Sequence, residues 1–144
     1  MASAQELVQQ VRSARSELEA ALGQCSDKWE AKPQAGEGED AWCQKEVAQH
    51  VIGADWFFTN GIAQACGAPA MDRPSIDVAT PQAALQSLQT VGAADDKILS
   101  KVQDGDLAKT FELRGLGSQS VEQMLQIMAG HARDHANQVQ AAGA

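Results

Sequence analysis

The segment from residue 121 to residue 139 carries two histidines within a helical pattern of apolar residues. His131 and His135 stand four positions apart, so on an α-helix their side chains lie one turn apart on the same face. The apolar members of that face are Val121, Met124, Leu125, Met128, Ala132 and Val139. Burying an imidazole without partners costs on the order of 1 to 3 kcal/mol, so two histidines on a core face require partners, and a shared metal ion would supply one.

The third histidine lies on a second helical stripe, in residues 43–65. The apolar residues of this stripe are Val47, Val51, Ala54, Phe57, Phe58, Gly61, Ile62 and Ala65. His50 falls among them, so all three histidines of the chain are predicted to face the core. Three neutral imidazoles would leave a coordination position open for water or substrate, which is typical of catalytic sites. We therefore predict that His50, His131 and His135 bind one divalent metal ion; ordinary core histidines with hydrogen-bond partners are the alternative.

Four stretches of helical periodicity, separated by segments with Pro and Gly, predict an all-α fold, a four-helix bundle formed by residues 1–144 as a single domain. The chain has no Tyr and few β-branched runs, which favours helices over sheet. The helices are expected over residues 3–25, 43–65 and 81–103 and from a capping box at Ser120–Gln123 onward. Residues 109–113 alternate weakly and could pack extended across the bundle.

The positions of the histidines along their helices predict the topology of the bundle. At a rise of 1.5 Å per residue, His50 lies about 10 Å from the start of its helix, and His135 lies about the same distance from the far end of its own. The two levels match when the second and fourth helices run antiparallel. This requires an up-down-down-up bundle with a crossover between helices 2 and 3. Residues 66–80 can make that crossover, because about 14 extended residues span roughly 45 Å against a helix of about 30 Å.

Charge and composition narrow the range of partners. The net charge is −8 and the pI is about 4.7, so the surface repels phosphate backbones and anionic lipid, and we expect no nucleic acid partner. No apolar stretch reaches the roughly 18 residues of a membrane span, and no basic segment precedes an apolar run at the N-terminus. We expect a cytoplasmic protein without a membrane contact. Cys25, Cys43 and Cys66 are widely separated and are expected to be free thiols.

Three further polar residues are candidates for a role near the histidines. Asp95 falls on the apolar stripe of the third helix, but a helix running parallel to the second places it some 12 Å from the level of His50, so we leave it out of the site. Glu46 and Gln138 lie one turn from His50 and His135, and each could hydrogen-bond a metal-bound water. For Glu46 a solvated position is the favoured alternative.

Two motifs resemble those of the DinB/YfiT superfamily of small four-helix metalloproteins. In that family Trp-Ser/Thr-x-x-Glu precedes a histidine on helix 2, and His-x-x-x-His-x-x-Gln-Ile/Val lies on helix 4. Here the corresponding segments are Trp42–Glu46 before His50 and His131–Val139. The resemblance implies an up-down-down-up bundle, a divalent ion such as Zn or Ni on the three histidines, and frequent dimers. Its characterised members transfer low-molecular-weight thiols, isomerise maleylpyruvate with mycothiol, or hydrolyse their substrates.

The chain departs from the family pattern in two ways. Cys43 replaces the capping Ser or Thr; it lies about 10 Å from His50, too far to bind the same ion, and we interpret it as a weak cap packed at the end of the bundle. The sequence also shows no clear basic cluster for a charged thiol cofactor.

Two functional hypotheses follow. In the first, a metal-dependent enzyme activates a water or thiol and acts on a small molecule as a thiol S-transferase or hydrolase. In the second, a non-catalytic bundle stores or senses the metal. We prefer the first, because three protein ligands leave the ion unsaturated.

The outer face of the second helix predicts a homodimer. Ile52 and Trp56 lie opposite the core stripe, where either a second subunit or a long loop must cover them. We predict a homodimer through this face, which sedimentation at tens of micromolar protein would detect. A monomeric mass would contradict the prediction.

Overall fold

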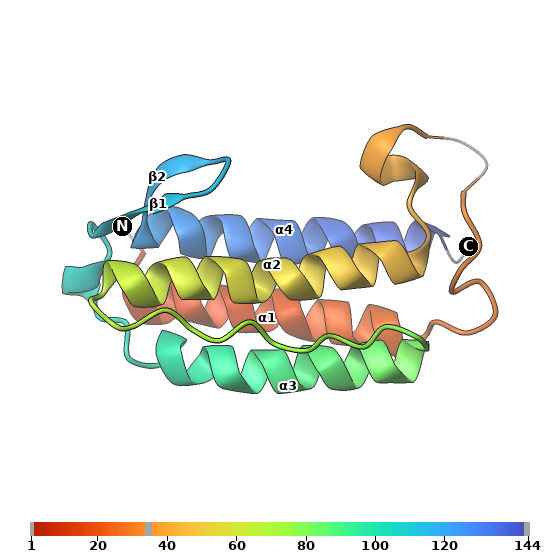
Figure 1. Cartoon of the computed structure of the whole chain (residues 1–144), viewed down its shortest axis with the longest axis horizontal. Coiled ribbons are helices and arrows are strands. Elements are labelled where there is room, and N and C mark those ends of the chain that lie inside the picture. The colour runs from red at the N-terminus through yellow and green to blue at the C-terminus, as the bar shows by residue number, and fades with distance from the viewer. Residues whose placement is uncertain (1, 34–35, 143–144) are drawn as a thin grey trace.

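The computed structural model describes residues 2–33 and 36–142 as a four-helix bundle with one small hairpin (Figure 1). This confirms the predicted helical bundle. The helices are α1 (Ala4–Gly23), α2 (Gln44–Ala65), α3 (Pro81–Leu99) and α4 (Val121–Ala142). The minor elements are the short helices η1 (Gly38–Ala41) and η2 (Asp104–Asp106) and the strands β1 (Thr110–Leu113) and β2 (Gly117–Ser120). None of the helices in the described residues has the length and apolar character to cross a membrane.

The helices lie side by side along one long axis. In Figure 1, α2 and α3 both begin at the right-hand end, and residues 66–80 run back along the bundle between the end of one and the start of the other. We call residues 66–80 the crossover segment. α4 packs against both α1 and α2. This arrangement brings the face of α4 that carries His131 and His135 next to α2.

Side chains cap the starts of α1 and α4, and the cap of α4 is the predicted capping box. The Ser3 hydroxyl accepts a hydrogen bond from the Glu6 amide at 3.1 Å. At the start of α4, Ser120 and Gln123 bond each other's backbone amides reciprocally, at 2.8 and 3.0 Å, as a capping box does. The third helix is shorter than predicted, since it ends at Leu99 rather than near residue 103.

Residues 110–120 form a small hairpin beside the helices, which agrees with the extended conformation considered for residues 109–113. Here β1 and β2 pair antiparallel, with Phe111 opposite Gln119. Leu113 is buried, and a Cβ on Gly61 of α2 would lie 2.7 Å from its Cδ2 atom. The hairpin therefore packs closely on α2 at a residue that has no side chain. The weak alternation in residues 109–113 was the sequence signal of this strand.

The outer face of α2 is covered by the chain itself. Ile52 is completely buried, and Ile76 and Val78 of the crossover segment belong to the same apolar cluster. Trp29 is buried in the same cluster, and its indole N–H donates to the Val78 carbonyl at 2.9 Å. Of the two alternatives for covering Ile52, a second subunit or a long loop, the structure shows the loop. Homodimerisation itself stays a prediction without that support.

A buried cluster of charged side chains joins α1, α2 and α3 away from the ends of the bundle. The Arg15 guanidinium pairs with Asp55 at 3.2 Å and with Asp96 at 2.8 Å. The Arg15 side chain can pack this closely against α3 because residue 92 is a glycine, where a Cβ would lie 2.9 Å from the Arg15 Cδ atom. Asp95 is completely buried beside this cluster, and neither of its carboxylate oxygens has a hydrogen-bond partner within the described residues. Burial, and then the neighbouring Asp55 carboxylate, raise the pKa of Asp95 far above its usual range.

Replacing Asp95 by Asn tests this protonation state. A folded acid with a raised pKa keeps a proton that the unfolded chain has released, so its contribution to stability falls as pH rises above about 4. We expect Asp95→Asn to be more stable than the parent at neutral pH by more than about 1 kcal/mol, with the difference shrinking toward pH 4. Urea unfolding at several pH values measures this. The exposed substitution Asp72→Asn is the control, and an Asp95→Asn variant that is less stable than the parent at neutral pH would contradict the assignment.

Candidate metal centre

The three predicted histidines converge on one point between α2 and α4. The Nε2 atom of His131 lies 3.0 Å from that of His50 and 3.0 Å from that of His135. Within the described residues these three form the one group of potential metal ligands found together, with all ligand atoms within 4.8 Å of one another. Tetrahedral zinc with Zn–N bonds of 2.0 to 2.1 Å would set its nitrogens about 3.3 Å apart. The cluster is therefore compatible with three imidazoles around one ion.

The histidines differ in burial. His135 is 5% exposed, whereas His50 and His131 are half-buried. The prediction that all three are core residues is thus correct for His135 only; the other two stand at the boundary between core and surface. One side of the cluster is therefore accessible to a ligand.

Gln138 fixes the orientation of His135. Its side-chain oxygen lies 2.8 Å from the His135 Nδ1 atom, and its amide N–H donates to the backbone carbonyl of Glu39. Because the amide nitrogen is a donor there, the oxygen accepts from Nδ1–H, which leaves the Nε2 lone pair of His135 free. Such bonds orient metal-binding histidines in proteins. Gln138 thus contacts the His135 ring directly.

Two residues beside His50 had no predicted role. The Glu39 carboxylate lies 3.5 Å from the His50 Nε2 atom, and the Trp42 ring meets the His50 imidazole edge-on with centroids 5.0 Å apart. Glu39 belongs to η1 in an irregular segment, where no periodicity could have revealed it. Trp42 was part of the family motif and directly precedes the cap of α2.

Glu46 and Cys43 do not reach the cluster. Glu46 accepts a hydrogen bond from the Cys43 amide at 3.1 Å and pairs with Lys32 at 3.2 Å. Cys43 is buried at the N-cap of α2, as predicted. Both residues therefore belong to the N-terminal cap of α2.

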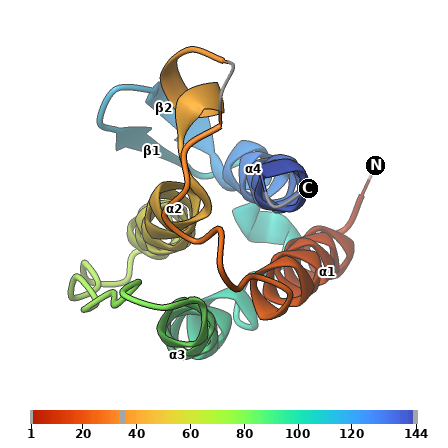
Figure 2. The same ribbon diagram turned by 90° about the vertical axis from the view of Figure 1, so that its right-hand side faces the viewer.

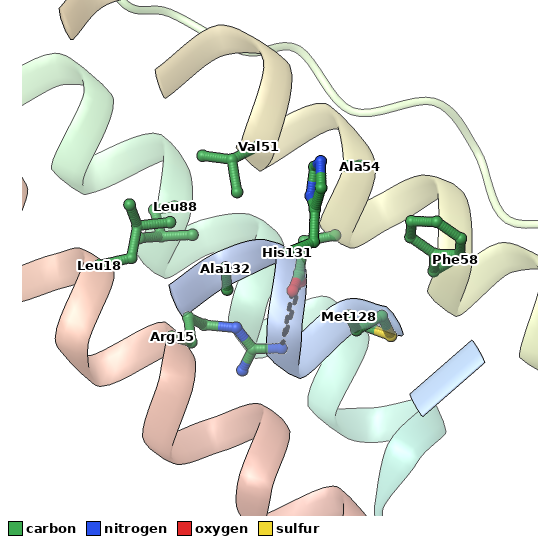
Figure 3. A pocket seen from close by; sticks show the side chains of 10 residues that line it. Arg15, Leu18, Val51, Ala54, Phe58, Leu88, Met128, His131 and Ala132 are labelled. Carbon is green, nitrogen blue, oxygen red and sulfur yellow. Dashed lines mark hydrogen bonds and ion pairs between the residues drawn. The ribbon is translucent and has the colours of Figure 1, made fainter. Parts of the chain in front are cut away.

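The surroundings favour neutral imidazoles. Burial, with a further contribution from the neighbouring imidazoles, lowers the pKa of His131 to about 4. Burial also lowers the pKa of His50. A cavity of about 10 Å³ has His131, Arg15 and Asp55 among its lining residues, and Figure 3 shows the Arg15 and His131 side chains that line it. His50 and His131 thus offer unprotonated nitrogens at neutral pH, the form that binds metals.

A larger cavity opens on the accessible side of the cluster. Its volume is about 810 Å³, within the range of small-molecule sites. His50 and His131 form part of its wall, together with Glu39. The remaining lining residues come from α2, α4, the crossover segment and the hairpin: Gln49, Gly53, Ala54, Trp56, Phe57, Phe58, Arg73, Pro74, Ile76, Arg114, Leu116 and Ile127.

Comparison with known proteins agrees with the motifs. The model of the DinB superfamily matches residues 10–139. The chain belongs to the DinB superfamily. The fold of this DinB-superfamily member is also similar to that of TT2238, described as a four-helix bundle protein, with a TM-score of 0.71, 20% identity and coverage of 96% of this chain and 98% of that one. No curated protein matches the sequence.

The lowered pKa of His131 is testable in this DinB-superfamily protein after treatment with a chelator. Because its folded pKa lies below the unperturbed value near 6.5, the ring should stay neutral as pH falls from about 8 to about 5. Nuclear magnetic resonance of the imidazole nitrogens in chelator-treated protein should show no titration of His131 in this range. A midpoint near 6.5 would contradict the assignment.

Proposed function

We propose that this protein is a metal-dependent enzyme in which His50, His131 and His135 hold one divalent ion, Zn or Ni. The observation that carries the proposal is the convergence of three Nε2 atoms beside a cavity that is large enough for a small molecule and is lined by two of the histidines, His50 and His131. A storage or sensing site needs no such cavity beside its ligands. The cavity therefore favours the enzyme over the non-catalytic alternative.

The residues around the proposed metal site have different roles. Three neutral imidazoles supply the nitrogens, and Gln138 holds His135 in the required tautomer. When bound, a divalent ion lowers the pKa of a water or thiol in its open position. The Glu39 carboxylate lines the cavity next to His50, where it can accept the proton that such a group releases. This chemistry suits a thiol S-transferase or a hydrolase acting on a small molecule.

Metal analysis of protein purified without an affinity tag tests the metal site. We expect one divalent ion per chain, bound more weakly as pH falls through about 6.5, since protons compete for the same nitrogens. Binding to the folded state alone contributes about 2.7 kcal/mol at a hundredfold excess over Kd, so a chelator should lower the Tm. His131→Ala should abolish both the bound metal and the chelator response, with its helical circular dichroism retained.

Asn137→Ala is the matched control, because Asn137 is exposed on the same helix. It should bind metal and respond to chelator as the parent does. If His131→Ala also behaves as the parent does, or the parent binds no divalent ion, the histidines are ordinary hydrogen-bonded residues and the proposal fails. Thiol-transfer and hydrolase assays on the metal-loaded protein then decide between an enzyme and a metal-binding bundle.

A further inference from the structure

We infer that the large cavity binds a small molecule with an apolar body and a carboxylate group, and that Arg73 and Arg114 hold the carboxylate. The inference deepens the proposed function by assigning a substrate class to the same site. It rests on that function for the reaction, whereas recognition of the carboxylate rests on the two arginines alone.

The two arginines reach one cavity from segments far apart in the chain. Arg73 lies in the crossover segment and Arg114 lies at the turn of the hairpin. Figure 2, which looks along the bundle, shows the crossover segment and the hairpin on different sides of α2. The cavity lies across the α2 surface between them, with lining residues from all three.

Both arginines are free to bind an anion. The other three arginines of the chain all make ion pairs: Arg12 with Asp96, Arg15 with Asp55 and Asp96, and Arg133 with Glu17. Arg73 and Arg114 are exposed and form no ion pair with any residue in 2–33 or 36–142. Unpaired guanidinium groups match the planar, two-oxygen geometry of a carboxylate.

The charge of the cavity is opposite to that of the protein. The whole chain carries 19 acidic residues against 11 Lys and Arg. The cavity lining instead contains two arginines and a single carboxylate, Glu39, which lies at the His50 end. A cationic site on an acidic surface selects anions locally, while the rest of the surface repels them.

The rest of the lining favours an apolar body. Leu116, beside Arg114, is 48% exposed and is the one large apolar residue found exposed in the described part of the chain. The other large apolar and aromatic lining residues are Trp56, Phe57, Phe58, Ile76 and Ile127. A ligand with an aliphatic or aromatic body would cover this surface and be stabilised by the removal of apolar area from water. Its carboxylate would face the arginines, and its opposite end would reach His50 and His131.

A matched pair of probes tests the inference. Phenylbutyrate and phenylbutanol share the apolar body and differ in the carboxylate. We would measure their binding by calorimetry to the full chain, both chelator-treated and metal-loaded, at low salt. Phenylbutyrate should bind about tenfold more tightly than phenylbutanol in both forms, because the arginines and not the metal recognise the anion.

Variants identify the groups responsible. Arg73→Gln and Arg114→Gln should each weaken phenylbutyrate binding about threefold, a modest loss because both side chains are exposed, and the double variant should bind the two probes equally. Phenylbutanol binding and metal content should not change. Lys97→Gln is the control, because it removes one positive charge from exposed α3 surface that does not line the cavity.

Four results would overturn the inference. They are failure of phenylbutyrate to bind, equal binding of the two probes to the parent, a double variant that keeps the preference, and a preference seen only in metal-loaded protein. Failure of the proposed metal site looks different, because the protein would then contain no metal and still prefer the carboxylate probe. Circular dichroism of each variant excludes loss of folding as the cause.

Discussion

The candidate centre depends on the packing of α2 against α4. His50 lies on one helix and His131 and His135 lie on the other, yet their ligand atoms fall within 4.8 Å of one another. Since each residue adds 1.5 Å along a helix, a slip of one residue between the helices would displace His50 by about that distance and remove the common coordination point. The side chains that pack above and below the histidines therefore determine whether a metal site exists at all.

Those side chains form two apolar clusters with a polar layer between them. One cluster holds Ala14, Met128 and Ala132, and the other holds Leu18 and Val51. The layer between them contains Arg15, Asp55, Asp95, His131 and His135. A shift of register would place these polar groups against apolar side chains at a cost of on the order of 1 to 3 kcal/mol each. The layer thus opposes such shifts, while the two clusters supply the burial that stabilises the bundle.

The bundle supplies the histidines, but segments outside it shape the space around them. η1 brings Glu39 to His50, the crossover segment brings Arg73, and the hairpin brings Arg114 and Leu116. The arrangement separates the proposed metal ligands, on rigid helices, from residues that would recognise a substrate, on connecting segments. Relatives with the same bundle and different connections could thereby bind different substrates.

The sequence alone determined where the helices lie, because helical periodicity and capping depend on residues only a few positions apart. It located α2 and α4, the capping box at Ser120, and the shared face of His131 and His135. Only the tertiary structure decided what lies beside them. The packing of the hairpin on α2, the burial of Ile52, the proximity of the Asp55 and Asp95 carboxylates and the presence of Arg73 and Arg114 in the wall of one cavity all join segments far apart in the chain. The connecting segments follow no apolar period, so nothing in their order reveals which surface they will cover.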